Sequence, residues 1–533
     1  MNNLQVSTHV DPQYDIVLST LNARYIHSAF GLRYLKANLG DYESACQIQE
    51  FTLDSRPEDV VEQLLASQPK VVGFGIYIWN VVQTEKVVAL LKAVSPDTIV
   101  VLGGPEVSYE QDDQAIISLS DYVITGWGEQ SFSDLIHTLF SVPSVTQPPS
   151  ASDHVLVPKE PTIITGVQPK LDRIKMPYYL YSEQDVKHRV LYVEASRGCP
   201  FKCEFCLSAL DKTAWPFDLE LFLDEMNELH KRGARHFKFV DRTFNLKVKN
   251  SLKIMQFFLD RMSDDLFLHF EVVPDHLPEA LKDMIAKFPS GQLQFEVGIQ
   301  TFNPEVQARI SRRQDNDKAE QNIHWIKQQS NAYLHTDLIF GLPGESLSSF
   351  GESFNKLVAL SPHEIQVGIL KRLKGSPIIR HTVPHKLVFN PNPPYSIVSN
   401  DQVSFQDVQF MGRFARYWDL IGNSGRFKFT LPLLIQEDAF AQFSVLTRSL
   451  FDQSGQTHKI SLNRLFDLVF NAARNDLKLD EKALLTVINQ DFDASGLKSK
   501  PKCLSGDRTK QPNQDIITEV KGKVKHSSRQ ARH

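Results

Sequence analysis

The alternation of apolar, strand-like segments with amphipathic, helix-like segments constrains the fold of this chain more than any other feature. It starts near residue 14 and continues to about 140, with expected strands at 14–20, 46–53, 70–79, 98–102 and 122–125 and expected helices at 30–39, 57–67 and 81–94. Strands that alternate with helices of this length form a parallel, doubly wound sheet. Such sheets bind ligands beyond the carboxyl ends of their strands. We therefore expect an α/β domain over residues 1–140.

The alternation resumes over residues 186–385, after a stretch at 141–185 that is rich in Pro, Ser and Thr. Strands are expected at 190–194, 236–240, 266–273, 293–299 and 333–340, and helices at 219–232 and 251–262. Repeated βα units of this kind close into a full or partial barrel of the TIM type. The stretch at 141–185 has little periodicity, which predicts a linker.

The remainder of the chain changes character. Residues 386–500 contain two expected helices, at 405–418 and 462–473, and few strand signals. We expect a mostly helical domain that shields the open barrel, with its aromatic residues in the core. Residues 501–533 are rich in Lys and Arg and poor in apolar residues, which predicts a disordered basic tail.

Composition excludes several classes of protein. The chain has 533 residues, enough for about three domains, and a formal net charge of -5, so it is not a nucleic-acid-binding polycation. No apolar run reaches the length of about 18 residues that predicts a membrane-spanning helix. The residues before Tyr14 lack the basic-then-apolar order of a secretion signal. We therefore expect a cytoplasmic protein with no membrane partner.

Three of the five cysteines lie within eight residues, in the sequence Cys199-Pro-Phe-Lys-Cys203-Glu-Phe-Cys206. This loop follows an expected strand, so three thiolates can converge there. A 4Fe–4S cluster with three cysteine ligands leaves one iron open to a further ligand, which a catalytic site needs. The alternative is a zinc site, which would require a fourth Cys or His at a suitable spacing; Cys46 and Cys503 are isolated.

The C-x3-C-x2-C loop after the first strand of a βα barrel resembles the signature of the radical S-adenosylmethionine (SAM) superfamily. The resemblance implies that Cys199, Cys203 and Cys206 hold a 4Fe–4S cluster. It also implies that SAM chelates the open iron and is cleaved to a 5′-deoxyadenosyl radical. Phe205, the aromatic residue before the third cysteine, matches the family pattern and would lie near the adenine.

Three later stretches resemble family positions that contact SAM. The segment around Asp241 and Thr243 follows the second barrel strand and would supply polar contacts, although it lacks the Gly-Gly-Glu form of many members. Glu296 and Gln300 lie in the fourth-strand pattern and are candidates for the ribose or carboxylate. The fifth-strand pattern, Asp337-Leu-Ile-Phe-Gly341-Leu-Pro-Gly344-Glu345, places Ile339 against the adenine.

The N-terminal domain lacks the G-x-G-x-x-G dinucleotide fingerprint after its first strand. Its glycines come later, as Gly103-Gly104 after the fourth strand and Gly126-Trp-Gly128 after the fifth, and they resemble the cobalamin-binding domain that often precedes a radical SAM barrel. A D-x-H-x-x-G loop would supply a histidine ligand to cobalt. The loop here has His27 without the aspartate, so a loop or substrate-facing histidine is the favoured interpretation.

The resemblance extends to the phrase Leu21–His27 and to the stretches 413–419 and 423–427. The latter two resemble an uncharacterised domain found after the barrel in one branch of cobalamin-dependent radical enzymes. The resemblance as a whole implies a cobalamin-dependent radical SAM enzyme that is a candidate C-methyltransferase. It also implies an electron donor such as flavodoxin or ferredoxin. Two alternatives stay open: a corrinoid or iron–sulfur sensor without turnover, and a radical tRNA-modifying enzyme. Neither the catalytic residues nor the substrate follow from the sequence.

Overall fold

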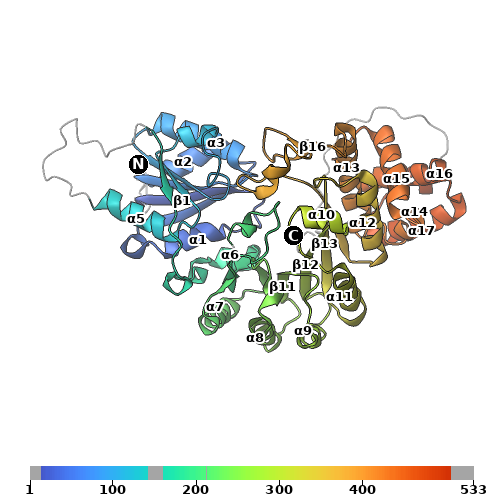
Figure 1. Ribbon diagram of the computed structural model, residues 1–533, viewed down its shortest axis with the longest axis horizontal. Coiled ribbons are helices and arrows are strands. Elements are labelled where there is room, and N and C mark those ends of the chain that lie inside the picture. The colour runs from blue at the N-terminus through green and yellow to red at the C-terminus, as the bar shows by residue number, and fades with distance from the viewer. Residues whose placement is uncertain (1–13, 142–159, 212, 506–533) are drawn as a thin grey trace, which may run out of the picture.

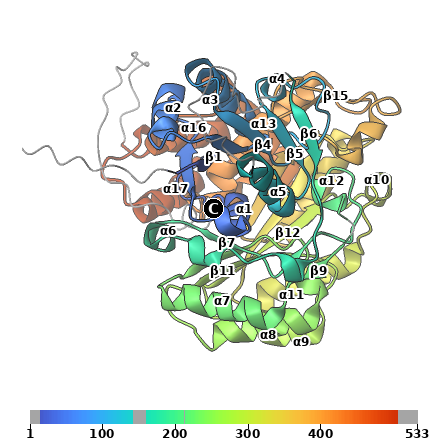
Figure 2. The same ribbon diagram turned by 90° about the vertical axis from the view of Figure 1, so that its left-hand side faces the viewer.

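The computed structural model describes residues 14–141, 160–211 and 213–505. Two parallel sheets of six strands each form the N-terminal and central parts, and a group of helices forms the C-terminal part (Figure 1). In Figures 1 and 2 the helices α7, α8 and α9 lie on the outer side of the central sheet, away from the N-terminal sheet. None of the helices in the described ranges is long and apolar enough to cross a membrane.

The N-terminal sheet confirms the predicted doubly wound fold. Its strand order is β2-β1-β3-β4-β5-β6, with all neighbours parallel. Helices α2 and α3 bury apolar residues against one face of the sheet, and α1 and α5 against the other. The strands are β1 (Ile16–Asn22), β2 (Cys46–Thr52), β3 (Val71–Gly75), β4 (Ile99–Gly103), β5 (Tyr122–Thr125) and β6 (Thr162–Thr165); the helices are α1 (Phe30–Ala37), α2 (Pro57–Leu65), α3 (Val81–Val94), α4 (Ala115–Ser118) and α5 (Glu129–Phe140).

The stretch expected to be a linker contributes the edge strand β6, which pairs with β5. Three of its four residues are exposed and the fourth is half-buried, so it has no apolar alternation for a sequence pattern to detect. Its β-branched residues suit an extended backbone. The N-terminal sheet therefore extends beyond the predicted boundary at residue 140.

The central sheet is a partial barrel, because its strand order β14-β13-β12-β11-β10-β7 leaves β7 and β14 as edges. Its convex face packs Phe237, Phe270 and Phe295 against the outer helices. The strands are β7 (Leu191–Val193), β10 (His236–Phe239), β11 (Phe267–Val272), β12 (Leu293–Gln300), β13 (Tyr333–Phe340) and β14 (Glu364–Ile369); the helices are α6 (Glu183–His188), α7 (Leu219–Lys231), α8 (Val248–Leu259), α9 (Glu279–Ile285), α10 (Pro304–Arg309), α11 (Asn316–Gln329) and α12 (Leu347–Ala359).

The C-terminal part is mostly helical, as predicted, and it shares one apolar core with the barrel. Phe354 of α12 packs against Phe414 and Trp418, with ring centroids 5.1 and 4.8 Å apart. The elements are β15 (Val388–Phe389), β16 (Ile397–Ser399), α13 (Phe405–Trp418), α14 (Leu431–Leu434), α15 (Ala439–Ser454), α16 (Leu462–Asn475) and α17 (Glu481–Ser495). Most of the predicted basic tail, from residue 506 onward, lies outside the described residues.

Each edge of the partial barrel is covered by another part of the chain. On the β7 side, the backbone N–H of Val190 donates to the carbonyl of Ile26 at 2.9 Å, and the hydroxyl of Ser28 donates to the carbonyl of Val190 at 3.0 Å. On the β14 side, the side-chain amide of Asn423 accepts from the N–H of Ile365 at 3.0 Å and donates to its carbonyl at 2.9 Å. Asn423 therefore satisfies the edge strand as a neighbouring strand would.

Replacing Asn423 with alanine should lower the free energy of unfolding by about 2–4 kcal/mol. Ile365 is buried, and each buried backbone group left without a partner costs about 1–3 kcal/mol. The midpoint of urea unfolding measures the change. Asn489→Ala removes an exposed side-chain bond to Asp493 and is the control, with an expected change within about 0.5 kcal/mol. Equal midpoints for the two variants would contradict the role of Asn423.

Candidate functional site

The cysteine loop starts from a rigid backbone. The short strand β8 (Ser196–Arg197) pairs antiparallel with β9 (Trp215–Pro216) just before the loop. Gly198 follows with φ +94, and a Cβ there would lie 2.1 Å from the carbonyl oxygen of Thr213, so only glycine fits. The N–H of Cys199 then donates to the carbonyl of Asp211 at 3.1 Å.

The three cysteines line one cavity of about 260 Å³, here called the cysteine cavity. Four other predicted SAM contacts line it as well: Phe205, Thr243, Glu296 and Gln300. The cavity also exposes charged residues that the sequence did not single out. These are Arg242, Glu271, Asp275, Arg312 and Arg313, together with Asp337 from the fifth-strand pattern.

Arg312 is the most informative of these additional residues. Its Nη1 lies 3.6 Å from the Sγ of Cys203. Burial raises the pKa of the Cys203 thiol, and the Arg312 guanidinium lowers it by favouring the thiolate. Within the described ranges, no group of three or more His, Cys, Asp or Glu side chains converges closely enough to hold a single metal ion. A cluster of four irons holds its thiolate ligands further apart than one metal ion does. The three thiols of this cavity and the positive charge of Arg312 beside them therefore suit a cluster.

A buried carboxylate holds the loop between the second and third cysteines. Glu204 accepts a hydrogen bond from His381 Nε2 at 2.7 Å and further bonds from Arg380 and the hydroxyl of Ser311. Its backbone carbonyl accepts from Ile378 at 2.9 Å. The partners of Glu204 are more than 100 positions away in the sequence, so no local pattern could reveal them.

Gln300 has the geometry of a ligand-binding residue. It adopts φ +70 where the pairing of β12 with β13 is irregular, a conformation that costs energy for a residue other than glycine. Its Oε1 is buried and has no hydrogen-bond partner among the described residues. The absence of a side chain at Gly298 makes space for the Gln300 side chain, since a Cβ at residue 298 would lie 2.3 Å from Gln300 Nε2. An unpaired buried acceptor in a cavity indicates a missing polar ligand.

Glu296 stays ionised at the floor of the cysteine cavity. Its carboxylate lies 3.1 Å from His269 Nε2 and 3.6 Å from Lys238 Nζ. Burial alone would raise its pKa, but these neighbours outweigh burial and hold the pKa well below its usual range. Glu296 therefore presents a negative charge to a ligand in the cavity.

Two predicted SAM contacts lie elsewhere. The carboxylate of Asp241 accepts from the N–H of Ala195 at 2.9 Å and the hydroxyl of Ser196 at 2.5 Å, and burial raises its pKa to about 7. It lines a neighbouring cavity and holds the strand that leads to the cysteines. Ile339 packs against the same apolar cluster as Phe205 and is not among the residues that line the cysteine cavity.

Glu345, at the end of the fifth-strand pattern, joins the ends of two barrel strands. Its buried carboxylate accepts a hydrogen bond from the hydroxyl of Thr301, just after β12. Burial raises the pKa of Glu345 to about 8. The carboxyl group is therefore protonated in the folded protein at neutral pH.

Replacing Glu345 with glutamine should remove one pH dependence of stability. Between pH 4.5 and about 8 the unfolded chain has lost the proton that the folded protein keeps, so the free energy of unfolding falls as pH rises. The glutamine variant should gain about 1–4 kcal/mol over the native protein on going from pH 5 to pH 8. Urea unfolding of both proteins at the two pH values measures this gain. A difference between the two proteins that stays constant with pH would contradict the elevated pKa.

The four predicted glycines line a second cavity of about 310 Å³, here called the glycine cavity. It lies at the carboxyl ends of β3, β4 and β5, where doubly wound sheets bind ligands. Gly104 has φ +107, and a Cβ there would lie 2.5 Å from the carbonyl oxygen of Ile76. Gly126 has φ +69 and faces open space. Gly103 and Gly128 complete the set, so the backbone can lie close to a large ligand.

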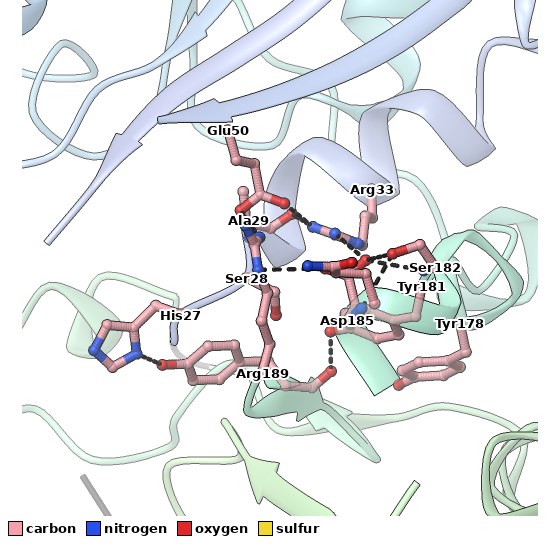
Figure 3. Close-up of polar contacts among 12 residues, drawn as sticks. His27, Ser28, Ala29, Arg33, Glu50, Tyr178, Tyr181, Ser182, Asp185 and Arg189 are labelled. Carbon is pink, nitrogen blue, oxygen red and sulfur yellow. Dashed lines mark hydrogen bonds and ion pairs between the residues drawn. The ribbon is translucent and has the colours of Figure 1, made fainter. Parts of the chain in front are cut away.

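His27 is not among the residues that line the glycine cavity. Its Nδ1 lies 2.7 Å from the hydroxyl of Tyr192 on β7, and its loop is held against the barrel (Figure 3). Burial, Lys238 and Arg24 lower the pKa of His27. This position agrees with a loop or substrate-facing histidine rather than with a cobalt ligand.

Family models match three consecutive parts of the chain. The "B12 binding domain" model matches residues 16–136, the "Radical SAM superfamily" model residues 193–357, and the "Protein of unknown function (DUF4080)" model residues 384–530. The first model contains the four glycines of the glycine cavity, and the second contains the three cysteines. They imply cobalamin, a 4Fe–4S cluster and SAM as cofactors. The glycine-lined cavity and the unpaired acceptor of Gln300 fit such ligands.

Two curated relatives and one solved structure extend the comparison. The 2-(S-pantetheinyl)-carbapenam-3-carboxylate methyltransferase of Streptantibioticus cattleyicolor is 25% identical over 351 residues, which is 60% of this chain and 50% of that protein. An uncharacterized methyltransferase of Pyrococcus horikoshii is 24% identical over 382 residues, 68% of this chain and 80% of that protein. The chain thus spans about half the length of the first relative.

The structure of the cobalamin-dependent S-adenosylmethionine radical enzyme OxsB with aqua-cobalamin bound is similar with a TM-score of 0.62. The match covers 93% of this chain and 83% of that one at 13% identity, so it bears on the fold alone. The order of domains, the two cavities and the family matches agree. The chain therefore contains a B12-binding domain, a radical SAM domain and a DUF4080 region, in that order.

Proposed function

We propose that this protein is a cobalamin-dependent radical SAM methyltransferase that acts on an unactivated carbon. When bound, the cluster and SAM supply a 5′-deoxyadenosyl radical, and cobalamin supplies a methyl group. The observation that carries the proposal is that one chain places three cysteines in one cavity and four glycines in another. Both curated relatives described above are named methyltransferases.

The protein's own residues hold and orient the ligands. Cys199, Cys203 and Cys206 bind iron as thiolates, and the positive charge of Arg312 beside Cys203 favours that state. Gln300 offers its unpaired Oε1 to a donor on SAM, and Glu296 offers a carboxylate to its ammonium group or ribose. Phe205 lies at the cavity wall, where it can pack against the adenine.

Reductive cleavage of SAM consumes an electron, so the protein needs a donor. We propose a small redox protein of the flavodoxin or ferredoxin type for this role. None of the five cysteines, all of which lie in the described ranges, forms a disulfide, which favours a reducing compartment such as the cytoplasm.

The test uses protein that is produced with cobalamin and purified without air. After iron and sulfide reconstitution, the visible spectrum should show both an iron–sulfur cluster and a corrinoid. Addition of SAM and dithionite should yield 5′-deoxyadenosine, and S-adenosylhomocysteine should report methyl transfer from SAM. Cluster-loaded protein that binds both ligands and forms neither product would instead be a sensor. Protein that holds no corrinoid would contradict the cobalamin dependence.

A further inference from the structure

Arg197 lines the glycine cavity and lies two residues before Cys199, the first cysteine of the cysteine cavity. Its Nη1 lies 2.6 Å from Glu129 Oε1 at the start of α5, and its Nη2 lies 2.5 Å from Glu194 Oε1 of the barrel. The guanidinium also lies 4.6 Å from the ring centroid of Trp127 and 4.8 Å from that of Tyr34. The charge is mostly buried, with 18% of the side chain exposed. Arg197 therefore contacts the N-terminal domain as well as the segment that leads from β7 to the cysteines.

The N-terminal partners of Arg197 belong to the glycine cavity. Trp127 lies between Gly126 and Gly128, and Glu129 follows directly. All of these residues line that cavity, as do Glu194 and Arg197 themselves. A ligand that fills the glycine cavity must therefore touch, or fix in place, the loop that holds the guanidinium.

The backbone of Arg197 leads into the cysteine cavity. Cys199 is only two residues away, and the intervening Gly198 is closely packed against Thr213. Arg197 itself pairs with Trp215 in the β8–β9 ladder. Residues 197–199 are closely packed and cannot deform easily. A displacement of Arg197 therefore also displaces Cys199.

A third cavity of about 220 Å³ shares lining residues with both of the others. Its lining includes Glu194 and Arg197, which also line the glycine cavity, and Arg242, which also lines the cysteine cavity. Arg242 Nη1 lies 2.8 Å from the carboxylate of Glu271, another residue of the cysteine cavity. The two cavities are therefore neighbours on either side of Arg197.

We propose that Arg197 is a positioning residue that couples occupancy of the glycine cavity to binding in the cysteine cavity. This inference rests on the proposed function, since it takes cobalamin as the first ligand and SAM as the second. A corrinoid seated against Trp127 restricts the Gly126–Glu129 loop, and the Arg197–Glu129 pair transmits that restriction to the Cys199 loop. Because such coupling is reciprocal, each ligand tightens the binding of the other by the same factor.

An arginine suits this role better than a lysine. The planar guanidinium presents separate N–H groups to Glu129 and Glu194 and stacks on the rings of Trp127 and Tyr34. A lysine keeps the charge between the two carboxylates but has one nitrogen and cannot hold both partners in this geometry. Arg197→Lys therefore weakens the connection while it avoids leaving two buried acids without a cation.

The experiment measures the dissociation constant of SAM for cluster-loaded protein, with and without hydroxocobalamin, by equilibrium dialysis under anaerobic conditions. In the native protein cobalamin should tighten SAM binding by about 5–150-fold, the usual range for coupled sites. In Arg197→Lys the ratio should fall to about one while each ligand alone still binds. Glu129→Gln, which changes the other partner of the Arg197–Glu129 ion pair, should also lower the ratio of the two dissociation constants. Arg416→Lys changes an ion-paired arginine in the C-terminal helices and should keep the native ratio.

The outcomes are distinguishable. A native ratio above one that persists in both Arg197→Lys and Glu129→Gln overturns the inference and leaves the proposed function intact. A native ratio of one also overturns it. Native protein that binds no hydroxocobalamin overturns both the inference and the cobalamin dependence. If Arg197→Lys does not fold, as judged by circular dichroism, Glu129→Gln alone decides the result.

Discussion

Cys203→Ala protein, reconstituted with iron and sulfide, should lose most of its cluster absorbance and form 5′-deoxyadenosine only at the level of protein without iron. The described cysteine cavity contains three thiols and no fourth, so the loss of one leaves a ligand set that cannot hold the cluster with a single open iron. Iron analysis, the visible spectrum and product quantification measure the effect.

The other two cysteines provide matched controls. Burial raises the pKa of Cys46 to about 12, and it lies in the N-terminal core. Burial and the nearby Asp467 raise the pKa of Cys503 to about 12 as well. Neither thiol is a ready thiolate, so Cys46→Ala and Cys503→Ala should retain the cluster and its activity. Full activity in Cys203→Ala, or equal losses in all three variants, would disprove the assignment of the cluster ligands.

Arg33→Met should lower the free energy of unfolding by about 3–5 kcal/mol, the usual cost of removing one partner from a buried ion pair. Arg33 lies between Glu50 and Asp185, at 2.7 and 2.8 Å, and all three side chains are at most 8% exposed (Figure 3). Arg189 lies 3.0 Å from Glu50 and completes the group. The variant leaves two buried carboxylates with one cation.

This group also holds the N-terminal domain on the barrel, since Arg33 lies on α1 and Asp185 on α6. Urea unfolding measures the stability, and limited proteolysis should detect separation of the two domains. Arg56→Met is the control, because Arg56 is 71% exposed and its ion pairs contribute about 0–1 kcal/mol. If both variants unfold at the same urea concentration, the interface does not depend on this ion-pair group.

Local sequence predicted most of the secondary structure and the two ligand cavities. The strands β3 and β4 have no polar side chain, and both of their faces are buried by helices. The three cysteines and the four glycines lie within short segments at strand ends, where parallel topology gathers them. Strand formation and the clustering of the cysteines and glycines depend on residues that are close in the sequence, so a sequence pattern can predict them.

Long-range contacts decided what the sequence could not. Gln300 was a candidate from sequence, but its unpaired acceptor follows from the bulge between β12 and β13. Arg312 reaches Cys203 from 109 positions away, and Asn423 completes β14 from 58 positions away. Neither residue belongs to a periodic sequence pattern. The role of a charged or amide side chain depends on which partner lies beside it in the folded protein.

The sequence by itself thus determined the types of domain and their order, and it predicted which residues hold iron and a corrinoid. Only the tertiary structure decided that these residues form two neighbouring cavities, that each barrel edge is covered by another domain, and that Arg197 lies between the cavities. The physical reason is the range of the interactions. Hydrophobic periodicity and glycine conformation are local properties of the chain, whereas a buried charge requires partners that only the folded arrangement supplies.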